Sequence, residues 1–195
     1  SSGVDGINVG ELRFYIDQNR TTIATDILQM RYVVQPIRGV EIPKPDGKTR
    51  LLGVPTVVDR WLQQAVSQQL APYFELDFEE ESYGFRPERN TQKAVQQSLR
   101  HINDGYQDVV DIDLKGFFDE VQHYRLLQLI YNKVKCRTTL WLIRKWLRAP
   151  ILKNGKLHKR RKGVPQGSPL SPLLSNIMLD QLDKYLKSEG CKFVR

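Results

Sequence analysis

The chain has 195 residues, of which 40% are hydrophobic and 27% are charged. This length and composition suffice for one sizeable core or two small abutting ones and exclude a disordered chain. Lys and Arg outnumber Asp and Glu by 30 to 22, so the formal charge of +8 favours polyanionic partners.

The two cysteines, Cys136 and Cys191, lie far apart in the sequence. Their spacing excludes a disulfide framework and a structural zinc site, and the three histidines do not supply a metal cage. No apolar run approaches the ~20 residues that span a bilayer, and the first residues lack a signal-peptide pattern. We therefore expect a protein of the reducing cytoplasm that has no membrane partner.

Hydrophobic periodicity predicts a succession of helices and hairpins. In chain order these are two short helices within residues 9–30 broken near position 19, a hairpin over 33–52, helices over 56–72 and 91–104, a strand over 106–114, helices over 123–132 and 138–148, a hairpin over 151–159, a helix over 171–189, and a strand from 191 onward. Asp-Gly at 46–47 and Asn-Gly at 154–155 favour tight hairpin turns. Thr56 with Asp59 resembles a capping box, and Ser171 followed by Pro172 resembles a helix start.

The segment 109–119 (VVDIDLKGFFD) combines a strand-like alternation with aspartates near its end. Val110 and Ile112 fall on one face, whereas Asp111 and Asp113 fall on the other. Such an aspartate can hold a hard divalent cation, because magnesium takes one or two carboxylates together with substrate phosphates and water. A solvent-facing strand with ordinary acidic residues fits the same pattern, so the spacing alone leaves both interpretations open.

The segment 163–176 (GVPQGSPLSPLLSN) is a Gly- and Pro-rich loop that leads into a helix. Gly163 and Gly167 allow backbone to approach a ligand closely. The helix start near Ser171 offers free N–H groups and the positive end of a dipole to a phosphate or sugar. A plain loop into a helix is the alternative, and composition does not separate the two.

These two segments, in this order, closely resemble the reverse transcriptases encoded by group II introns. Two more stretches agree: residues 42–55 (IPKPDGKTRLLGVP) resemble the family's fingers motif, and residues 82–89 (SYGFRPER) resemble the motif that follows it. Residues 3–6 (GVDG) are similar to the amino-terminal extension of group II and non-LTR enzymes. The resemblance covers nearly the whole chain.

The resemblance implies an α+β fold, the fingers and palm of a right-hand polymerase, with an antiparallel palm sheet backed by helices. Residues 1–105 correspond to the fingers with the amino-terminal extension, and residues 106–195 to part of the palm, with a helical insertion at about 122–160. The family places a Tyr/Phe-Ala-Asp-Asp hairpin directly after the strand that begins at Cys191. We therefore expect the chain to stop before two of three catalytic carboxylates and to lack the thumb and maturase domains. Such a fragment is expected to fold, to be inactive alone, and to form a homodimer through exposed apolar surface.

The resemblance also implies RNA-directed DNA synthesis by a two-metal mechanism. Mg²⁺, or Mn²⁺ in its place, bridges palm aspartates and the triphosphate while the primer 3′-hydroxyl attacks the α-phosphorus. Asp113 matches the first palm aspartate, and the backbone carbonyl of Leu114 matches a further metal ligand. Asp111 is the competing choice for the role of the first palm aspartate. Phe118 matches an aromatic steric gate against the nucleotide 2′-hydroxyl, with a plain core aromatic as the alternative.

Other positions match contacts to nucleotide and template. Lys44 and Arg50 match basic fingers residues that fold over the triphosphate, and Gln166 matches a glutamine that touches the nascent pair and the incoming sugar. Further matches predict contacts with template or intron RNA: Arg86, Gly167, Lys159, Arg160, Arg161 and Lys162. The last four belong to the basic run at 153–162, for which a solvated charged face is the alternative.

The expected partners are an RNA template and intron RNA, a DNA primer or target, and deoxynucleoside triphosphates. Two other functions remain open. One is an RNA-binding maturase that has lost polymerase activity. The other is a related reverse transcriptase from a retron, a diversity-generating element or a CRISPR locus. The amino-terminal extension and the Gly-Phe-Arg-Pro stretch argue mainly against the retron and diversity-generating enzymes. They argue less strongly against the CRISPR-linked enzyme.

Overall fold

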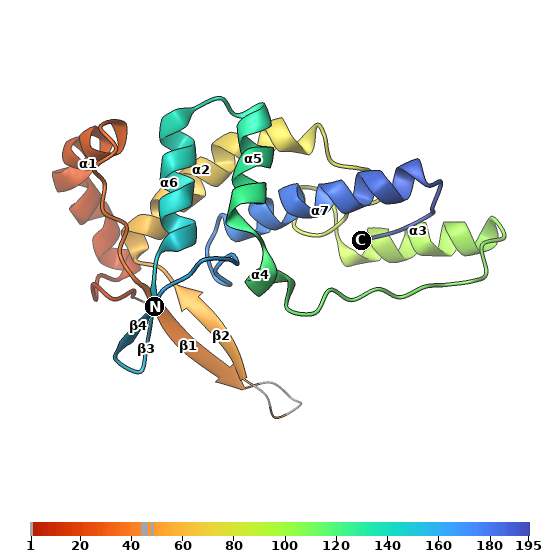
Figure 1. Ribbon diagram of the computed structural model, residues 1–195, viewed down its shortest axis with the longest axis horizontal. Helices are drawn as coiled ribbons and strands as arrows, with labels where there is room; N and C mark the ends of the chain where they lie inside the picture. Colours follow the sequence, from red (N-terminus) through yellow and green to blue (C-terminus); the bar gives the residue numbers. More distant parts are fainter. Residues whose placement is uncertain (1, 44–46, 48) are drawn as a thin grey trace.

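The computed structural model describes residues 2–43, 47 and 49–195 (Figure 1). The helices are α1 (Leu12–Leu28), α2 (Val57–Glu75), α3 (Thr91–Asn103), α4 (Phe117–Glu120), α5 (His123–Lys133), α6 (Arg137–Arg148) and α7 (Ser171–Ser188), with a short 3₁₀ turn at Val9–Glu11. The strands are β1 (Ile37–Pro43), β2 (Thr49–Val54), β3 (Ile151–Lys153) and β4 (Lys156–His158). The mixture confirms the predicted α+β class.

The four strands form one sheet in the order β2-β1-β3-β4. β1 pairs with β2 in antiparallel fashion, and β3 pairs with β4 likewise, so both predicted hairpins are confirmed. Asn154 and Gly155 have φ angles of 50° and 72°, which is the geometry that a tight primed turn requires. A parallel pairing of Ile37 with Ile151 joins the two hairpins into a single sheet.

The main core lies among the helices. α5 packs against α6 and α7, and α2 packs against α7. Several large side chains there are almost fully enclosed: Leu126, Ile130, Ile143, Leu147 and Leu170. In Figure 1 α2, α5 and α6 lie above the sheet, whereas α7 and α3 extend away from it toward the other end of the molecule. No helix in the described part of the chain is long and apolar enough to cross a membrane.

A buried carboxylate joins the segment before β1 to α2 and α6. Asp59 is 1% exposed and accepts hydrogen bonds from Thr56 Oγ1 at 2.9 Å, Trp146 Nε1 at 2.9 Å and Tyr32 Oη at 3.1 Å. The Asp59 backbone N–H donates to Thr56 Oγ1 at 3.2 Å, so Thr56 caps α2 as predicted. Burial raises the pKa of Asp59, and the donors oppose that shift because they favour the charged form.

Some predicted helix boundaries are wrong. The segment 9–30 forms one α-helix after its 3₁₀ turn, because Asn19 donates to the carbonyl of Tyr15 at 2.8 Å inside the helix instead of interrupting it. α2 continues through Pro72 to Glu75, although this proline cannot donate a hydrogen bond to the carbonyl of Gln68 one turn earlier. The cap position of α7 is Leu170, one residue before the predicted Ser171.

The predicted strand at 106–114 is absent from the structure. This segment pairs with no strand in the described part of the chain and runs as an open connection from α3 to α4 (Figure 1). Val110 and Ile112 are 82% and 64% exposed, so the face expected to be buried faces outward. Alternating apolar residues make a strand only where neighbouring backbone supplies hydrogen bonds.

The predicted strand from Cys191 is also absent as a regular element. Its last residue nevertheless forms strand-like bonds with the loop before α3. The Arg195 N–H donates to the carbonyl of Glu81 at 2.8 Å, and its carbonyl accepts from the Tyr83 N–H at 2.6 Å. The Arg195 guanidinium binds Asp183 of α7, which is 1% exposed, at 2.6 and 2.8 Å. This contact fixes residues 81–83 against α7.

Candidate active site

The loop that carries Gln166 is bonded to the turn that follows Asp113. The Gly163 N–H donates to the carbonyl of Val121, and the Val164 N–H donates to that of Phe118, both at 2.7 Å. Gly163 has a φ of +84°, and a β-carbon there would lie 2.9 Å from the Phe118 carbonyl oxygen. Only glycine fits this approach without displacing backbone.

The other side of the same loop is bonded to β2. The Gly53 N–H donates to the carbonyl of Gln166 at 2.8 Å, and Arg50 Nε donates to Gln166 Oε1. Gly167 has a φ of +114°, and its β-carbon would lie 2.6 Å from the Gly53 carbonyl oxygen. The two loop glycines therefore make room for protein backbone in this structure, where the sequence suggested a ligand. Template passage at Gly167 stays a prediction.

Three predicted motifs thus meet at one place. β2 brings Arg50, the loop brings Gln166, and α4 brings Phe118, although these positions are far apart in sequence. Lys44, the second predicted triphosphate contact, lies outside the described residues, so its role stays a prediction.

Asp113 and Leu114 sit at the end of the open connection, just before α4. Both are exposed, as is Asp111. The Leu114 carbonyl accepts from the Phe117 N–H at 3.2 Å in the turn, which leaves its second lone pair for another partner. Carboxylate and carbonyl oxygens suit Mg²⁺, which needs only one or two protein carboxylates beside phosphates and water. No group of three or more acidic, His or Cys ligands that could hold a metal ion occurs among the described residues.

Phe118 is partly buried at the start of α4. Its ring meets that of Phe117 edge to face, with centroids 5.7 Å apart, and both rings pack against the main core. This arrangement contains the features of both interpretations, a core contact and a fixed aromatic beside the Gln166 loop. Discrimination against a 2′-hydroxyl stays a prediction for this residue.

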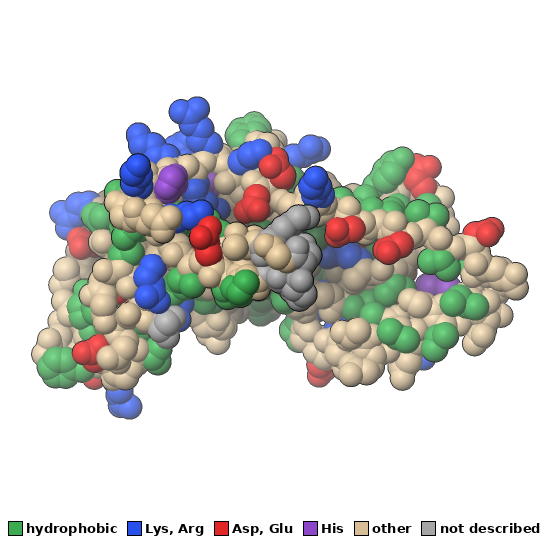
Figure 2. All heavy atoms as spheres, turned by 90° about the horizontal axis from the view of Figure 1, so that it is seen from below, with side chains coloured by type: hydrophobic (Ala, Val, Ile, Leu, Met, Phe, Trp, Pro, Cys, Tyr) green, Lys and Arg blue, Asp and Glu red, His purple; other side chains and the backbone are tan. Residues whose placement is uncertain are grey.

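The basic run surrounds the second hairpin. Lys159, Arg161 and Lys162 are exposed, and Lys162 forms an ion pair with Glu120 at 2.6 Å. Arg160 is partly buried; burial lowers its pKa, and the charge of Asp119 opposes the shift. In Figure 2 most Lys and Arg side chains on the visible face lie on the half with this hairpin, whereas apolar side chains gather on the half with α3.

Arg86 has an internal role in this structure. It is 8% exposed and forms an ion pair with Glu75 at 2.7 Å. It also donates to the carbonyls of Glu79 and Ser82 at 2.5 and 2.8 Å. The guanidinium therefore holds together the acidic loop after α2, and the contact of Arg86 with RNA stays a prediction.

The start of α7 does not form an open phosphate site. Ser171 and Leu174 are each 2% exposed, and Ser171 Oγ donates to the carbonyl of Pro165 at 2.7 Å. The first turn of the helix is thus packed inside the protein. Of the two interpretations of this segment, the structure supports a loop that leads into a buried helix.

Sequence analysis did not identify His123 as part of the site. This side chain is 7% exposed, and its Nε2 lies 2.8 Å from the carbonyl oxygen of Gly163. Burial lowers its pKa, the hydrogen bond with the Gly163 carbonyl opposes that shift, and the charges of Arg160 and Arg148 lower the pKa further. No local pattern marks this residue, because its partner is 40 positions away in the chain.

Comparison with known proteins decides the family. Residues 42–195 match the family described as "Reverse transcriptase (RNA-dependent DNA polymerase)". The chain belongs to this reverse transcriptase family. The match confirms the family that the sequence motifs indicated.

Curated relatives of this reverse transcriptase chain include intron-encoded proteins. The group II intron-encoded protein LtrA of Lactococcus lactis subsp. cremoris is 41% identical over 165 residues, which cover 84% of this chain and 27% of LtrA. The protein YkfC of Escherichia coli (strain K12) is 36% identical over 188 residues, which cover 94% of this chain and 49% of YkfC. The putative COX1/OXI3 intron 2 protein of Saccharomyces cerevisiae is 32% identical over 188 residues, 95% of this chain and 21% of that protein. The chain therefore spans less than half the length of each of these relatives.

A solved structure shares the fold. A chain of the partial Cas6-RT-Cas1–Cas2 complex superimposes with a TM-score of 0.61 at 27% identity, covering 94% of this chain and 31% of that chain. The predicted polymerase fold is thus supported by a known structure over nearly the whole chain.

Proposed function

We propose that this chain is the fingers and part of the palm of a group II intron-type reverse transcriptase, an RNA-directed DNA polymerase that also binds intron RNA. Residues 1–105 form the fingers with the amino-terminal extension, and residues 106–195 form part of the palm with its helical insertion. The observation that carries this proposal is the Gln166 loop, which is bonded on one side to the Phe118 turn and on the other to Gly53 and Arg50 of β2. A nucleotide placed at that loop meets the fingers and the palm together.

Each residue of the site has a definite task in this proposal. Asp113 and the Leu114 carbonyl would hold the Mg²⁺ ion, and the ion would supply positive charge to neutralise the triphosphate and to favour ionisation of the primer hydroxyl. Arg50 grips phosphate oxygens, and Gln166 lines the sugar and the nascent base pair. Because these two side chains bond to each other in the free protein, Arg50 must release Gln166 when the nucleotide enters. Phe118 fills the space next to the sugar and rejects a 2′-hydroxyl.

The exposed basic residues supply the RNA-binding part of the function. Lys159, Arg161 and Lys162 lie on the segment that leads from β4 into the Gln166 loop, so phosphates held there lead toward the site. Neutralising cations of this kind reduces the salt dependence of RNA affinity by about one unit of slope for each contact. The partners proposed are template and intron RNA, a DNA primer or target and deoxynucleotides, in the cytoplasm.

Primer extension by the complete gene product tests the assignment of the metal ligand. Asp113→Asn is expected to lower the rate of nucleotide addition by about 1,000-fold or more, because a metal ligand supplies several kcal/mol of transition-state stabilisation. Asp111→Asn is the matched control, since it removes the same charge two positions away and is expected to keep most activity. Equal losses in both variants would remove Asp113 from its assigned role.

A separate assay tests Phe118 as the steric gate against ribonucleotides. Phe118→Val is expected to raise the use of ribonucleotides relative to deoxynucleotides by about 10- to 100-fold, which is the discrimination that steric exclusion in a pocket supplies. Phe117→Val changes the partner ring of the same aromatic pair and serves as the control. An unchanged ribonucleotide preference in the Phe118 variant would support the plain core interpretation.

A CRISPR-associated reverse transcriptase is the second candidate, because the superimposed chain belongs to a Cas6-RT-Cas1–Cas2 complex. Genomic context separates the two functions. A flanking intron with its catalytic RNA domains supports the first, whereas an adjacent or fused Cas1 reading frame supports the second.

A further inference from the structure

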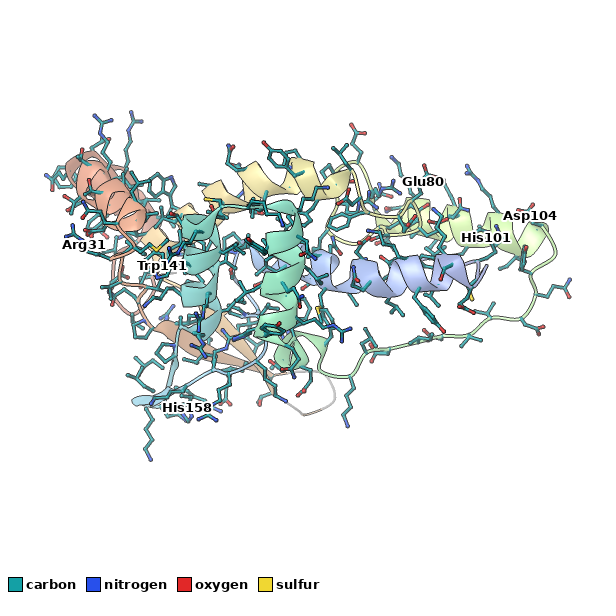
Figure 3. The ribbon with its side chains drawn as sticks, turned by 45° about the horizontal axis from the view of Figure 1, so that its top comes forward. Arg31, Glu80, His101, Asp104, Trp141 and His158 are labelled. Atoms are coloured by element: carbon teal, nitrogen blue, oxygen red, sulfur yellow. The ribbon has the colours of Figure 1, made fainter. Side chains whose placement is uncertain are left out.

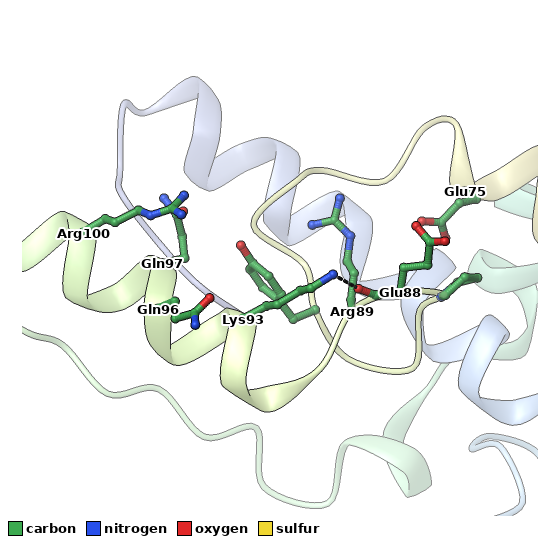
Figure 4. A pocket seen from close by; sticks show the side chains of 9 residues that line it. Glu75, Glu88, Arg89, Lys93, Gln96, Gln97 and Arg100 are labelled. Atoms are coloured by element: carbon green, nitrogen blue, oxygen red, sulfur yellow. Dashed lines mark hydrogen bonds between the residues drawn. The ribbon is translucent and has the colours of Figure 1, made fainter.

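A cavity of about 480 Å³ lies between α3, the loop before it and the end of α2 (Figure 4). None of the residues assigned to nucleotide binding lines it. Its lining residues are mostly charged or amide-bearing: Glu75, Tyr83, Pro87, Glu88, Arg89, Lys93, Gln96, Gln97 and Arg100. The composition excludes an apolar ligand and points to a charged one.

α3 presents its polar stripe to this cavity. Lys93, Gln96, Gln97 and Arg100 recur at intervals of three, one and three residues, so they share one helix face. Lys93 and Arg100 are exposed and lie about 10 Å apart along the helix axis. Two cations at this separation, with amide groups between them, form a row that matches successive anionic groups better than a single small anion.

A third cation, Arg89, is held in place beside this row. Its guanidinium lies over the ring of Tyr83, 5.3 Å from the centroid, and its Nη1 donates to the carbonyl of Glu80. The remaining guanidinium N–H groups have no hydrogen-bond partner among the described residues. An arginine fixed in this way loses little side-chain entropy when it binds an anion.

The two acidic side chains of the cavity lie at the α2 end (Figure 4). Glu75 is already neutralised by its ion pair with Arg86 at 2.7 Å. Glu88 provides its backbone carbonyl to Lys93 Nζ at 2.5 Å. The cavity therefore has a cationic side along α3 and one acidic group, Glu88, that opposes an anionic ligand.

We propose that this cavity, with Arg89, Lys93 and Arg100, binds the phosphodiester backbone of RNA outside the polymerase cleft. Guanidinium and ammonium groups bind phosphate oxygens, and the amides of Gln96 and Gln97 donate hydrogen bonds to phosphate or to the ribose hydroxyls that distinguish RNA. The inference rests on the proposed function insofar as the chain must bind RNA at all. It adds a second, separate contact surface for that RNA.

The location of the cavity makes the two surfaces independent. In Figure 3 His101 of α3 and Glu80 of the adjoining loop lie at one end of the molecule, and His158 at the end of β4 lies near the other. The last four residues of the basic run, at 159–162, follow His158 directly in the chain and lead to the Gln166 loop. One RNA molecule that occupies both surfaces must extend along the length of the protein.

Affinity for a ~30-nucleotide single-stranded RNA, measured against salt concentration with the full chain, tests the proposal. Lys93→Gln with Arg100→Gln is expected to lower the slope of log affinity by about 1.5 and to weaken binding about 30-fold at about 0.1 M salt. Arg125→Gln with Lys145→Gln removes the same charge from exposed positions on α5 and α6 and is the control. Glu88→Gln is expected to strengthen binding about threefold, a gain that a purely structural role would not produce.

The outcomes separate this inference from the proposed function. If the wild-type chain binds RNA, and if binding weakens in the Lys159→Gln, Arg161→Gln variant but not in the Lys93→Gln, Arg100→Gln variant, the cavity is not an RNA-binding surface. That result leaves the proposed function intact. A wild-type chain that binds no RNA overturns both. If RNA affinity falls equally in the α3 variant and in the α5 and α6 control, the effect is one of net charge. That result also overturns the proposal that the cavity binds RNA. Thermal unfolding of each variant verifies that the fold persists.

Discussion

Replacing Gly163 with alanine tests the junction between the Gln166 loop and the turn that follows Asp113. The new methyl group would lie 2.9 Å from the carbonyl oxygens of Phe118 and Asp119, both of them backbone atoms that cannot rotate away. A φ of +84° adds about 1 kcal/mol for any L-residue with a side chain. The loop must therefore move away from the turn.

The size of the effect follows from the bonds that join these segments. The two backbone hydrogen bonds across the junction, both 2.7 Å long, are stretched or lost, and each contributes about 1 kcal/mol. Together with the conformational term, Gly163→Ala is expected to destabilise the protein by about 3 kcal/mol. Gly155→Ala is the matched control, because that glycine has a φ of +72° but open space around it, so it should cost only about 1 kcal/mol.

Urea unfolding followed by circular dichroism measures both variants. The difference of about 2 kcal/mol corresponds to a midpoint about 1 M lower for the Gly163 variant than for the Gly155 variant. Equal midpoints for the two variants would refute the close packing of the loop on the turn, because only the conformational term would then remain.

Two further predictions concern buried polar groups. Trp146→Phe removes the indole N–H that donates to Asp59 at 2.9 Å. This substitution is expected to lower the free energy of unfolding by about 2 kcal/mol, measured by urea titration at pH 7. An unchanged free energy of unfolding would show that the buried carboxylate does not need this donor. His123 has a pKa lowered by burial and by the nearby charges of Arg160 and Arg148, so the unfolded chain binds its proton more readily. The contribution of His123 to the free energy of unfolding is therefore expected to be complete above the ordinary pKa of 6.5 and to be lost as the pH falls below that value. His123→Gln is expected to flatten this part of the plot of unfolding free energy against pH. An identical pH profile in the variant would contradict this prediction.

Local signals in the sequence predicted most of the helices and both hairpins. The Asn-Gly pair at 154–155 determined the second hairpin, because few other residues accept two positive φ angles in succession. Thr56 marked the start of α2 through a hydrogen bond that spans only three residues. Such features are predictable since each depends on neighbours within one turn of chain.

Contacts between distant residues were not predictable in this way. The parallel pairing of Ile37 with Ile151 joins segments more than a hundred residues apart, and neither segment carries a sign of the other. The strand expected at 106–114 failed for the related reason that alternation shows which side chains share a face but supplies no hydrogen-bonding partner. Motif resemblance, unlike periodicity, contains information about tertiary neighbours, and it assigned Arg50 and Gln166, which are bonded to each other in the structure, to one predicted site.

The joined sheet has a mechanical consequence. Since β1 is bonded to both β2 and β3, the hairpin that carries Arg50 and the hairpin formed by β3 and β4 cannot move independently. A hinge motion that brings Arg50 onto an incoming nucleotide would move the basic run at 153–162 in the same direction. Under the proposed function, nucleotide binding and template binding would therefore be coupled through the two residue pairs between β1 and β3.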